Sequence, residues 1–226
     1  MLFNNVKILT MVKFISPFLI FACILYAVPA KSQENWKLRK DKNGIKVFSR
    51  ETKNYKFDEL KVECEIEGRI SQLAALLFDV NTQYEWAYKT KKSELLKEVS
   101  ASDVYFYTEI ECPWPYQNRD MVVHMTMQQN PANKILTVQA KNVDNYLPLK
   151  NDIVRLAYSS AVWTVTPISN QRFKIVYQIQ LDMGDNVPAW LTNLFAVDGP
   201  YDSFSNMKKQ IKLPKYAQAK YASIVD

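Results

Sequence analysis

The central part of the chain alternates between apolar and polar positions over several short stretches. In residues 59–66 every second residue is apolar, and this row consists of Leu60, Val62, Cys64 and Ile66. A repeat of two residues sends alternate side chains to opposite faces of a strand, so one face is expected to be buried and the other solvated. The same repeat predicts strands at residues 45–50, 104–111, 121–128, 134–141, 153–166 and 172–182. Because these stretches follow one another with short turns between them, they predict an antiparallel sheet.

Between these strands, one group of apolar residues recurs every three or four positions. The group consists of Ile70, Leu73, Ala74 and Leu77, and its spacing predicts a helix with one buried stripe. A second helical stretch is expected to carry Tyr84, Trp86 and Tyr88. Residues 36–40 are expected to form a short helical or irregular lead, and the Asn43-Gly44 pair after it indicates a turn.

The C-terminal part of the chain is predicted to end in a long helix. Pro188 suits its first turn, where the missing N–H costs nothing. Its apolar residues, roughly at helical spacing, are Trp190, Leu191, Leu194, Phe195, Tyr201, Phe204 and Ile211. Gly199-Pro200 is expected to bend or break this helix. A sheet with one apolar face must bury that face, and this helix is the available cover, so the pattern predicts an α+β fold.

The first thirty residues have the pattern of a targeting segment. The basic residues Lys7 and Lys13 precede the apolar run 14–28, and Val28-Pro29-Ala30 offers a cleavage site after Ala30. This order is typical of a secretory signal peptide. Residues 31–226 are therefore expected to be a single domain, exported to the periplasm or the cell exterior. An uncleaved membrane anchor is the alternative, although the run is shorter than the roughly 20 residues that a membrane-spanning helix needs.

Composition and charge narrow the possible functions. The chain has 226 residues, 48% of them hydrophobic, which is typical of a globular protein and excludes wholesale disorder. Its formal net charge of +6 is mild, and no aromatic-basic motif accompanies it. We therefore expect no nucleic-acid partner.

Catalytic signatures are missing from the sequence. His124 is the only histidine, so any histidine-based triad or zinc site must use it. The alternation puts His124 on the expected solvent face, opposite the row Met121, Val123, Met125 and Met127. No nucleophile elbow, phosphate-binding glycine loop or Cys-x-x-Cys motif is present. The sequence predicts a non-enzyme without metal or cofactor.

After removal of the signal peptide two cysteines remain, Cys64 and Cys112. Export permits a disulfide between them, and two free buried thiols on separate strands are the other possibility.

Several short motifs occur in a recognisable order. Residues 112–120 read Cys-Pro-Trp-Pro-Tyr-Gln-Asn-Arg-Asp, residues 44–50 read Gly-Ile-Lys-Val-Phe-Ser-Arg, and residues 187–193 read Val-Pro-Ala-Trp-Leu-Thr-Asn. Trp163 is followed four residues later by Pro167. With these motifs the chain resembles the START (steroidogenic acute regulatory-related lipid transfer) domain family over about residues 36–212. One departure is residues 182–185, Asp-Met-Gly-Asp, where many members have Asp-Pro-Gly-Gly.

The resemblance implies a helix-grip fold, in which a curved antiparallel sheet surrounds the long C-terminal helix and leaves an internal hydrophobic tunnel. It implies that the tunnel binds, and that the protein transfers, a lipid or sterol-like molecule, with transient membrane contact and a monomeric state. The residues expected to line the tunnel are Phe106, Thr108, Ile110, Met121, Val123, Met125, Tyr177, Ile179, Trp190, Leu194 and Phe195. Trp190, Leu194 and Phe195 are expected to form the roof on the closing helix, which would be the gate. A polyketide cyclase or hydratase of the same superfamily is the alternative, and only Tyr177 and Thr108 offer polar groups for it.

The resemblance also suggests what the tunnel has lost. Some steroid-binding relatives hold a polar head with an acidic and a basic residue, and these positions correspond here to Phe106 and Met125. We therefore expect a ligand whose polar group is weak or uncharged.

Two further sets of residues are given structural roles. Arg119 and Asp120 are expected to pin the Pro-Trp-Pro loop, with Trp114 plugging the end of the sheet. The basic tail consists of Lys208, Lys209, Lys212, Lys215 and Lys220. It is interpreted as a solvated face, with contact to anionic lipid headgroups as the alternative.

Overall fold

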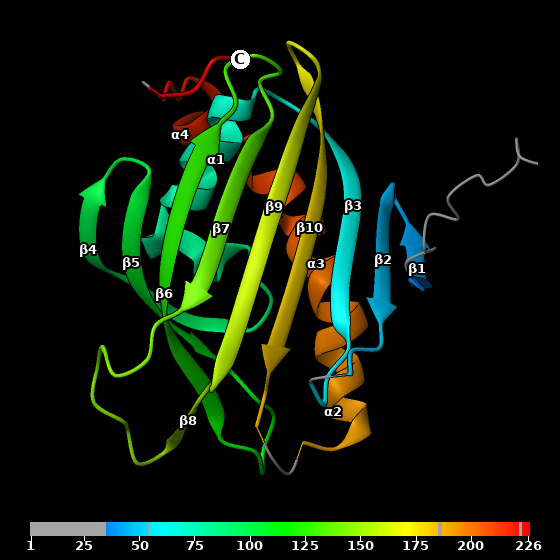
Figure 1. The fold of residues 1–226 in the computed structure, drawn as a ribbon, viewed down its shortest axis with the longest axis vertical. Coiled ribbons are helices and arrows are strands. Elements are labelled where there is room, and N and C mark those ends of the chain that lie inside the picture. The colour runs from blue at the N-terminus through cyan, green and yellow to red at the C-terminus, as the bar shows by residue number, and fades with distance from the viewer. Residues whose placement is uncertain (1–34, 54, 185–186, 222) are drawn as a thin grey trace, which may run out of the picture. The chain divides into compact units, whose positions relative to one another are not determined.

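One ten-stranded sheet makes up most of the described chain, and it curves around the C-terminal helix (Figure 1). The structure is a computed structural model that describes residues 35–226 except 54, 185–186 and 222. The expected signal peptide lies outside the described residues. The strands follow the order β1-β2-β3-β10-β9-β7-β6-β5-β4, and β8 pairs with β6 in parallel. All the other pairings are antiparallel, which confirms the predicted α+β class.

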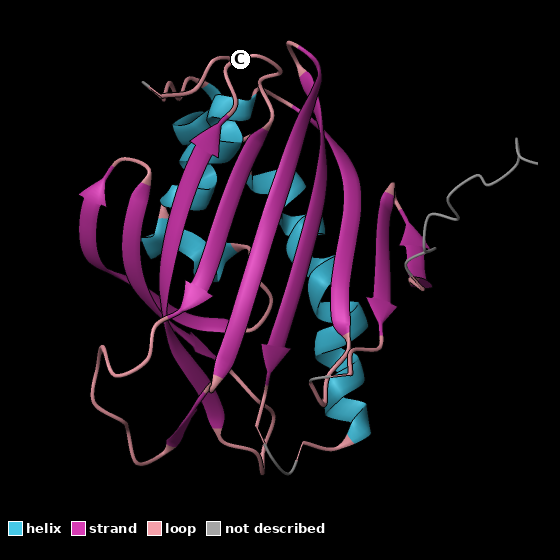
Figure 2. Ribbon diagram, viewed as in Figure 1, coloured by secondary structure: helices cyan, strands magenta, loops and turns pink. Residues whose placement is uncertain are grey.

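The strands are β1 (Lys37–Lys42), β2 (Ile45–Arg50), β3 (Glu59–Glu67), β4 (Thr90–Ser100), β5 (Asp103–Ile110), β6 (Asn118–Gln129), β7 (Leu136–Asn142), β8 (Ile153–Arg155), β9 (Tyr158–Ser169) and β10 (Arg172–Asp182). The helices are α1 (Ile70–Phe78), a 3₁₀ helix (Val80–Glu85), α2 (Ala189–Asn193), a π-helical turn (Leu194–Asp198), α3 (Gly199–Gln210) and α4 (Pro214–Ala217). Figure 2 shows the helices on one face of the sheet.

The buried face of the sheet is the one that the alternation predicts. Strands β3 and β10 are paired so that Cys64 lies opposite Ile175, and both side chains are buried. Helix α3 packs Phe204 and Met207 into the same core. The apolar rows of the strands and the helix thus bury one another, which is the physical reason for the layer of helix on sheet.

The structure differs from the sequence-based predictions of local structure in four places. Residues 36–40 belong largely to strand β1 rather than to a helical lead, and residues 90–100 form strand β4, which was not predicted. Both are edge strands rich in charged residues, so they bury too few side chains to show a clear two-residue repeat. The stretch predicted as one strand at residues 153–166 is divided into β8 and β9. The second helical stretch is a 3₁₀ helix that ends at Glu85, so Trp86 and Tyr88 lie just beyond it.

The closing helix is not broken at Gly199-Pro200. Gly199 has a helical φ of −56°, and α2, the π-helical turn and α3 follow one another without a gap. A proline lacks the N–H that would bond to the preceding turn, and its ring crowds the carbonyl four residues earlier. The π-helical turn directly before Pro200 accommodates this misfit, because it widens the helix at that point.

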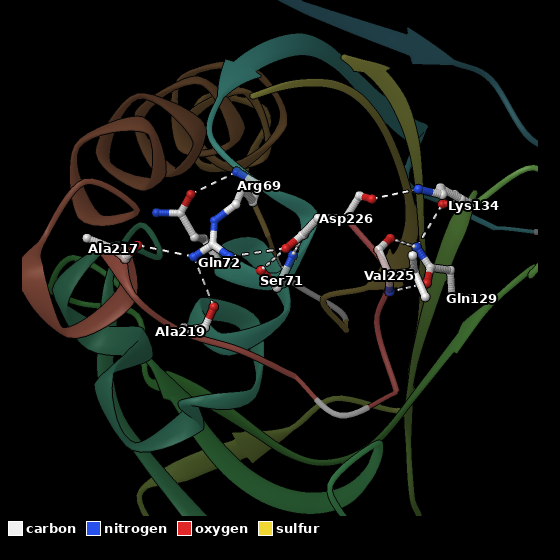
Figure 3. Close-up of polar contacts among 9 residues, drawn as sticks. All are labelled: Arg69, Ser71, Gln72, Gln129, Lys134, Ala217, Ala219, Val225 and Asp226. Atoms are coloured by element: carbon white, nitrogen blue, oxygen red, sulfur yellow. Dashed lines mark hydrogen bonds and ion pairs between the residues drawn. The ribbon is translucent and has the colours of Figure 1, made fainter. Parts of the chain in front are cut away.

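A C-terminal tail anchors the start of α1 to the β6–β7 hairpin (Figure 3). The side chain of Asp226 accepts hydrogen bonds from the Ser71 N–H at 2.8 Å, from the Ser71 hydroxyl at 2.7 Å and from Arg69 at 3.2 Å. Arg69 also donates to the carbonyls of Ala217 and Ala219, both at 3.1 Å. On the hairpin side, Gln129 bonds to the Val225 backbone and Lys134 to the Asp226 carbonyl.

Cys64 and Cys112 are both buried and free in the structure, so the disulfide alternative is not realised there. Within the described residues, no helix has the length and apolar character needed to cross a membrane.

Candidate functional site

An apolar cavity of about 230 Å³ lies between the sheet and the closing helix. Strands β3, β4, β5, β6, β7, β9 and β10 contribute its sheet side, and Phe195 and Phe204 are among the residues that the closing helix contributes. Hollows of about 390 and 550 Å³ also occur, but loops and outward-facing polar side chains line them. The interior cavity is therefore the candidate site for a hydrophobic ligand.

The structure brings nearly all of the predicted lining residues together around this cavity. Those that line it are Phe106, Thr108, Ile110, Met121, Val123, Met125, Tyr177, Ile179 and Phe195. They come from the consecutive strands β5 and β6 and from β10 and the closing helix, which lie much later in the sequence. The two-residue repeat identified them because all the strand residues among them face the helix.

Trp190 and Leu194 do not line the cavity, so the expected roof is only partly correct. Trp190 is 52% exposed, and its ring contacts that of Tyr116 in an edge-to-face arrangement with the ring centroids 5.9 Å apart. The neighbouring Leu191 is fully buried instead. A helix can turn only one stripe inward, and Leu191 and Phe195 belong to that stripe at a spacing of four residues.

Sequence reasoning missed several residues of the cavity. They include Leu60, Leu77, Trp86, Tyr88, Ala140, Ala161, Trp163 and Phe204. Leu60 and Phe204 carried a usable signal, since both belong to apolar rows that were identified. Trp86 and Tyr88 carried none, because they lie beyond the 3₁₀ helix where no repeat applies.

Three aromatic rings form one packed group in the cavity wall. The ring centroids of Trp163 lie 4.4 Å from Tyr177 and 5.2 Å from Phe204, and those of Tyr177 and Phe204 lie 5.6 Å apart. Burial raises the pKa of the Tyr177 phenol above its ordinary value, so this hydroxyl is neutral at physiological pH. The group joins β9, β10 and α3 through apolar contact.

No charged side chain is among the described residues that line the cavity. Phe106 and Met125, the positions suggested for a lost charge pair, both lie in the lining. The hydroxyl of Ser203 is already used, because it donates to the Gly199 carbonyl at 2.8 Å and accepts from the Tyr88 N–H at 2.9 Å. The lining is thus mainly apolar with a few neutral polar groups.

The Pro-Trp-Pro loop is held by polar contacts rather than by its tryptophan. Trp114 is 91% exposed, so the prediction that it plugs the end of the sheet is wrong. Asn118 accepts from the Cys112 N–H at 3.1 Å and donates to Glu109 at 2.7 Å. Arg119 donates to the Gln117 and Met183 carbonyls. These contacts fix the backbone of the loop and leave the indole ring outside.

Asp120 has a structural role, but its ion pair is with Arg155 of β8 and not with the Pro-Trp-Pro loop that it was expected to pin. Its fully buried carboxylate accepts two hydrogen bonds from Arg155, at 2.6 and 3.2 Å. The same guanidinium reaches the carbonyls of Leu147 and Pro148. The Asp120–Arg155 pair therefore holds the loop between β7 and β8, which is a structural role rather than a catalytic one.

The remaining candidate groups lie away from the cavity. His124 stacks on Tyr105 and bonds to Asp103 at 2.8 Å. Two lysines of the basic tail pair with carboxylates, Lys212 with Glu67 and Lys215 with Asp79 and Glu85. No group of residues that could hold a metal ion occurs in the described part of the chain.

A curved antiparallel sheet that holds a long C-terminal helix over an apolar cavity defines the helix-grip class of binding proteins. A family model of the START domain matches residues 20–215, and the chain belongs to the START domain family.

The chain is similar to several proteins over most of its length. It is 27% identical over 175 residues to an uncharacterised protein of Pseudomonas aeruginosa, covering 77% of this chain and 86% of that protein. It is 25% identical over 194 residues to the phosphatidylcholine transfer protein of Rattus norvegicus, with coverages of 83% and 89%. A solved STAR-related lipid transfer protein from Xanthomonas axonopodis matches with a TM-score of 0.72 at 29% identity, covering 79% of this chain and 99% of that structure.

Proposed function

We propose that the chain binds one lipid-like hydrophobic molecule in its cavity and transfers it between membranes without altering it chemically. The observation that carries this proposal is an interior cavity with an apolar lining and no charged side chain among its described residues. The similarity to a phosphatidylcholine transfer protein and to a STAR-related lipid transfer protein supports it.

Native mass spectrometry of protein purified from its host, followed by solvent extraction, tests this function. We expect a bound hydrophobic molecule that the extraction recovers and identifies. An empty protein that takes up no fluorescent lipid, but turns over an aromatic polyketide, would instead identify it as a cyclase.

Transient contact with a membrane is part of the proposal. Trp114 and Trp190 are exposed by 91% and 52%, and Tyr116 of the Pro-Trp-Pro loop touches Trp190 at the start of the closing helix. Tryptophan is favoured at membrane interfaces, because its ring is apolar and its N–H is polar. These three residues, the docking aromatics, supply a surface next to the helix that covers the cavity.

Export of the protein also belongs to the proposal, with cleavage after Ala30. The basic, apolar and small-residue order of residues 7–30 supports it. N-terminal sequencing of the mature protein tests it, and a membrane-bound protein that retains its original N-terminus would be an anchored protein instead.

A further inference from the structure

Tyr177 on β10 carries a hydroxyl group that the fold leaves without a partner. No described residue forms a hydrogen bond with it, and burial alone raises the pKa of its phenol, with no neighbouring charge involved. Tyrosine hydroxyls that are buried in proteins usually have a hydrogen-bond partner, because the loss of water without replacement is costly. The partner of this hydroxyl must therefore come from what occupies the space beside it.

The accessible part of Tyr177 faces the interior cavity. Strand β10 lies between β3 and β9, and contacts with Trp163 and Phe204 put Tyr177 on its inner face. Tyr177 lines the cavity and is only partly buried. In the described part of the chain, the buried polar atoms that are shut off from open space without a partner belong to Trp86, Ser93, Gln180 and Gln210. The Tyr177 hydroxyl is not among these atoms, so a group in the cavity can touch it.

Tyr177 also marks the inner end of the cavity. Along the inner face of β10 the lining extends from Leu181 to Tyr177, and the next residue on this face, Ile175, is fully buried and outside the lining. On β9 the lining ends in the same way between Trp163 and Val165. The opposite end lies about 13 Å along β10, where Leu181 precedes the connection to α2.

Two other hydroxyl groups of the lining lie towards the opposite end. Ser159 is four residues from the β9 partner of Tyr177. Thr108 is paired with Met121, which is six residues from Met127, the residue of β6 in the row of Tyr177. A ligand oxygen bound by Tyr177 would thus lie at a different place from one bound by Ser159 or Thr108.

The chemistry of the phenol and of the lining limits the partner. A neutral phenol donates one hydrogen bond through its O–H, so a partner that satisfies this donor is an acceptor. A phosphate or carboxylate is an acceptor too, but a buried anion needs a counter-charge, and no described residue of the lining is charged. The suitable partner is therefore a neutral oxygen, such as that of a ketone, an ester or an alcohol.

We infer that the polar end of the ligand lies at the inner end of the cavity, where the Tyr177 hydroxyl donates a hydrogen bond to its uncharged oxygen, and that its hydrocarbon chain extends towards α2. The inference rests on the proposed function and specifies the ligand class and orientation. The packed rings of Trp163 and Phe204 hold the phenol in place before the ligand arrives, so binding need not order it.

A competition experiment tests the selection. Wild-type protein is offered equal amounts of 2-tridecanone, tridecane and dodecanoate at pH 8, all supplied from cyclodextrin. Gas chromatography of the protein fraction after gel filtration gives the bound ratios. The ketone and the alkane have the same number of carbons and differ in the acceptor, and dodecanoate differs from the ketone in its charge. We expect the ketone to be bound in preference to both.

Tyr177→Phe removes the hydroxyl and keeps the ring that packs on Trp163 and Phe204. We expect the ketone-to-alkane ratio to fall about three- to tenfold, the range expected for one hydrogen bond. Comparing the variant with the wild type cancels any preference of the cyclodextrin, and a general packing defect would lower the binding of both probes. Tyr84→Phe is the matched control, because Tyr84 is 53% exposed and lies outside the lining, and it is expected to leave the ratio unchanged.

NMR of the bound ketone tests the orientation in the wild type, without depending on a variant. With 2-tridecanone labelled with carbon-13 at the carbonyl, the carbonyl signal is expected to lie at lower field than in hexane, because it accepts a hydrogen bond. The nuclear Overhauser effect is expected to connect the ring protons of Tyr177 with the methyl group beside the carbonyl. In Tyr177→Phe the carbonyl signal should return towards its position in hexane.

Several results would overturn the inference. They are an unchanged ratio and carbonyl signal in a folded Tyr177→Phe variant, a contact of the Tyr177 ring with the far methyl group of the chain, and preferred binding of dodecanoate. A ratio that falls in Thr108→Val but not in Tyr177→Phe would place the ligand oxygen at the opposite end and overturn it as well. Binding of none of the probes, or of any lipid, would instead contradict the proposed function.

Discussion

The need for a glycine at position 199 comes from a neighbouring side chain, because the backbone angles of Gly199 are those of an ordinary helix. A Cβ atom at this position would lie 3.0 Å from Cδ1 of Tyr88, which lines the cavity beside it. The rings of Tyr88 and Phe195 also form an edge-to-face contact, with their centroids 6.0 Å apart. The absence of a side chain at Gly199 therefore lets the closing helix approach the segment that carries Tyr88.

Gly199→Ala is expected to lower the free energy of unfolding by about 1–2 kcal/mol, because overpacking outweighs the gain in helix propensity. In a Tyr88→Ala background the sign should reverse, and the same change should stabilise the protein by about 0.5–1 kcal/mol. Urea unfolding of the four proteins measures both effects. A loss of the same size in both backgrounds would show that Tyr88 is not the cause.

The thiol of Cys64 is expected to be unreactive in the folded protein. Burial raises its pKa to about 12, so about one molecule in ten thousand carries the reactive thiolate at pH 8. In a Cys112→Ser variant of residues 31–226, Ellman's reagent should modify Cys64 at least a hundredfold more slowly than in urea. Fast labelling without denaturant would mean that β3 opens readily or that the thiol is not buried.

At the scale of elements, the start of α1 depends on the tail. The N–H of Arg69, the residue before the helix, donates to the side chain of Gln72 at 2.8 Å. The N–H of Ser71, in the first turn, donates to the side chain of Asp226. A carboxylate at this end also complements the helix dipole. A residue more than 150 positions away thus acts as part of the cap of α1.

Asp226→Ala is expected to destabilise the protein by about 1 kcal/mol, the usual effect of losing a cap. Hydrogen exchange at Ser71 should become faster, while β9 and β10 should keep their protection. Val225→Ala is the control, because the exposed Val225 contacts Gln129 through its backbone. Equal exchange at Ser71 in both variants would argue against a cap by Asp226.

The elements also show how far the sequence can predict this fold. Strands β3, β6 and β10 could be predicted because each has one buried face, and the two-residue repeat then fixes which side chains meet. Strands β1 and β4 could not, because they lie at the edges and their charged residues hide the repeat. The continuity of the closing helix through Pro200 could not either, since it depends on a π-helical turn that has no sequence signal of its own.

The site was predictable to the same extent. The repeat places Phe106, Thr108 and Tyr177 on the inner face, and the structure puts them in the lining. The segment with Trp86 and Tyr88 enters the cavity through tertiary packing, which a periodic pattern does not encode. Trp190 was misplaced for a related reason, because an apolar residue near the end of a helix can also lie on its exposed face.

At the scale of the whole molecule, the docking aromatics predict separable functions for the cavity and the surface. Trp114→Ala combined with Trp190→Ala is expected to weaken binding to neutral phosphatidylcholine vesicles roughly tenfold or more, because the lost rings no longer bury apolar area in the bilayer. Lipid transfer between vesicles should slow accordingly. Both residues lie outside the cavity lining, so loading from cyclodextrin should be unchanged.

Vesicle flotation and a loading assay on the same samples check this prediction. Ile168→Ala is a control, since Ile168 is 43% exposed on β9 and belongs to neither the cavity nor the docking aromatics. Vesicle binding that is unchanged in the double variant would place the membrane contact elsewhere on the protein.

A lining without fixed charge also determines what can drive the release of the cargo. The ionisable groups among its described residues are the phenols of Tyr88 and Tyr177, and burial raises the pKa of both. Neither mild acid nor salt therefore changes the charge that a bound molecule meets. Titration of these lining residues therefore does not make loading or release one-way. If the proposed transfer depends on the cavity alone, it brings the chemical potential of the lipid in two membranes towards equality, and a net direction then comes from a reaction that produces the lipid in one membrane or consumes it in the other.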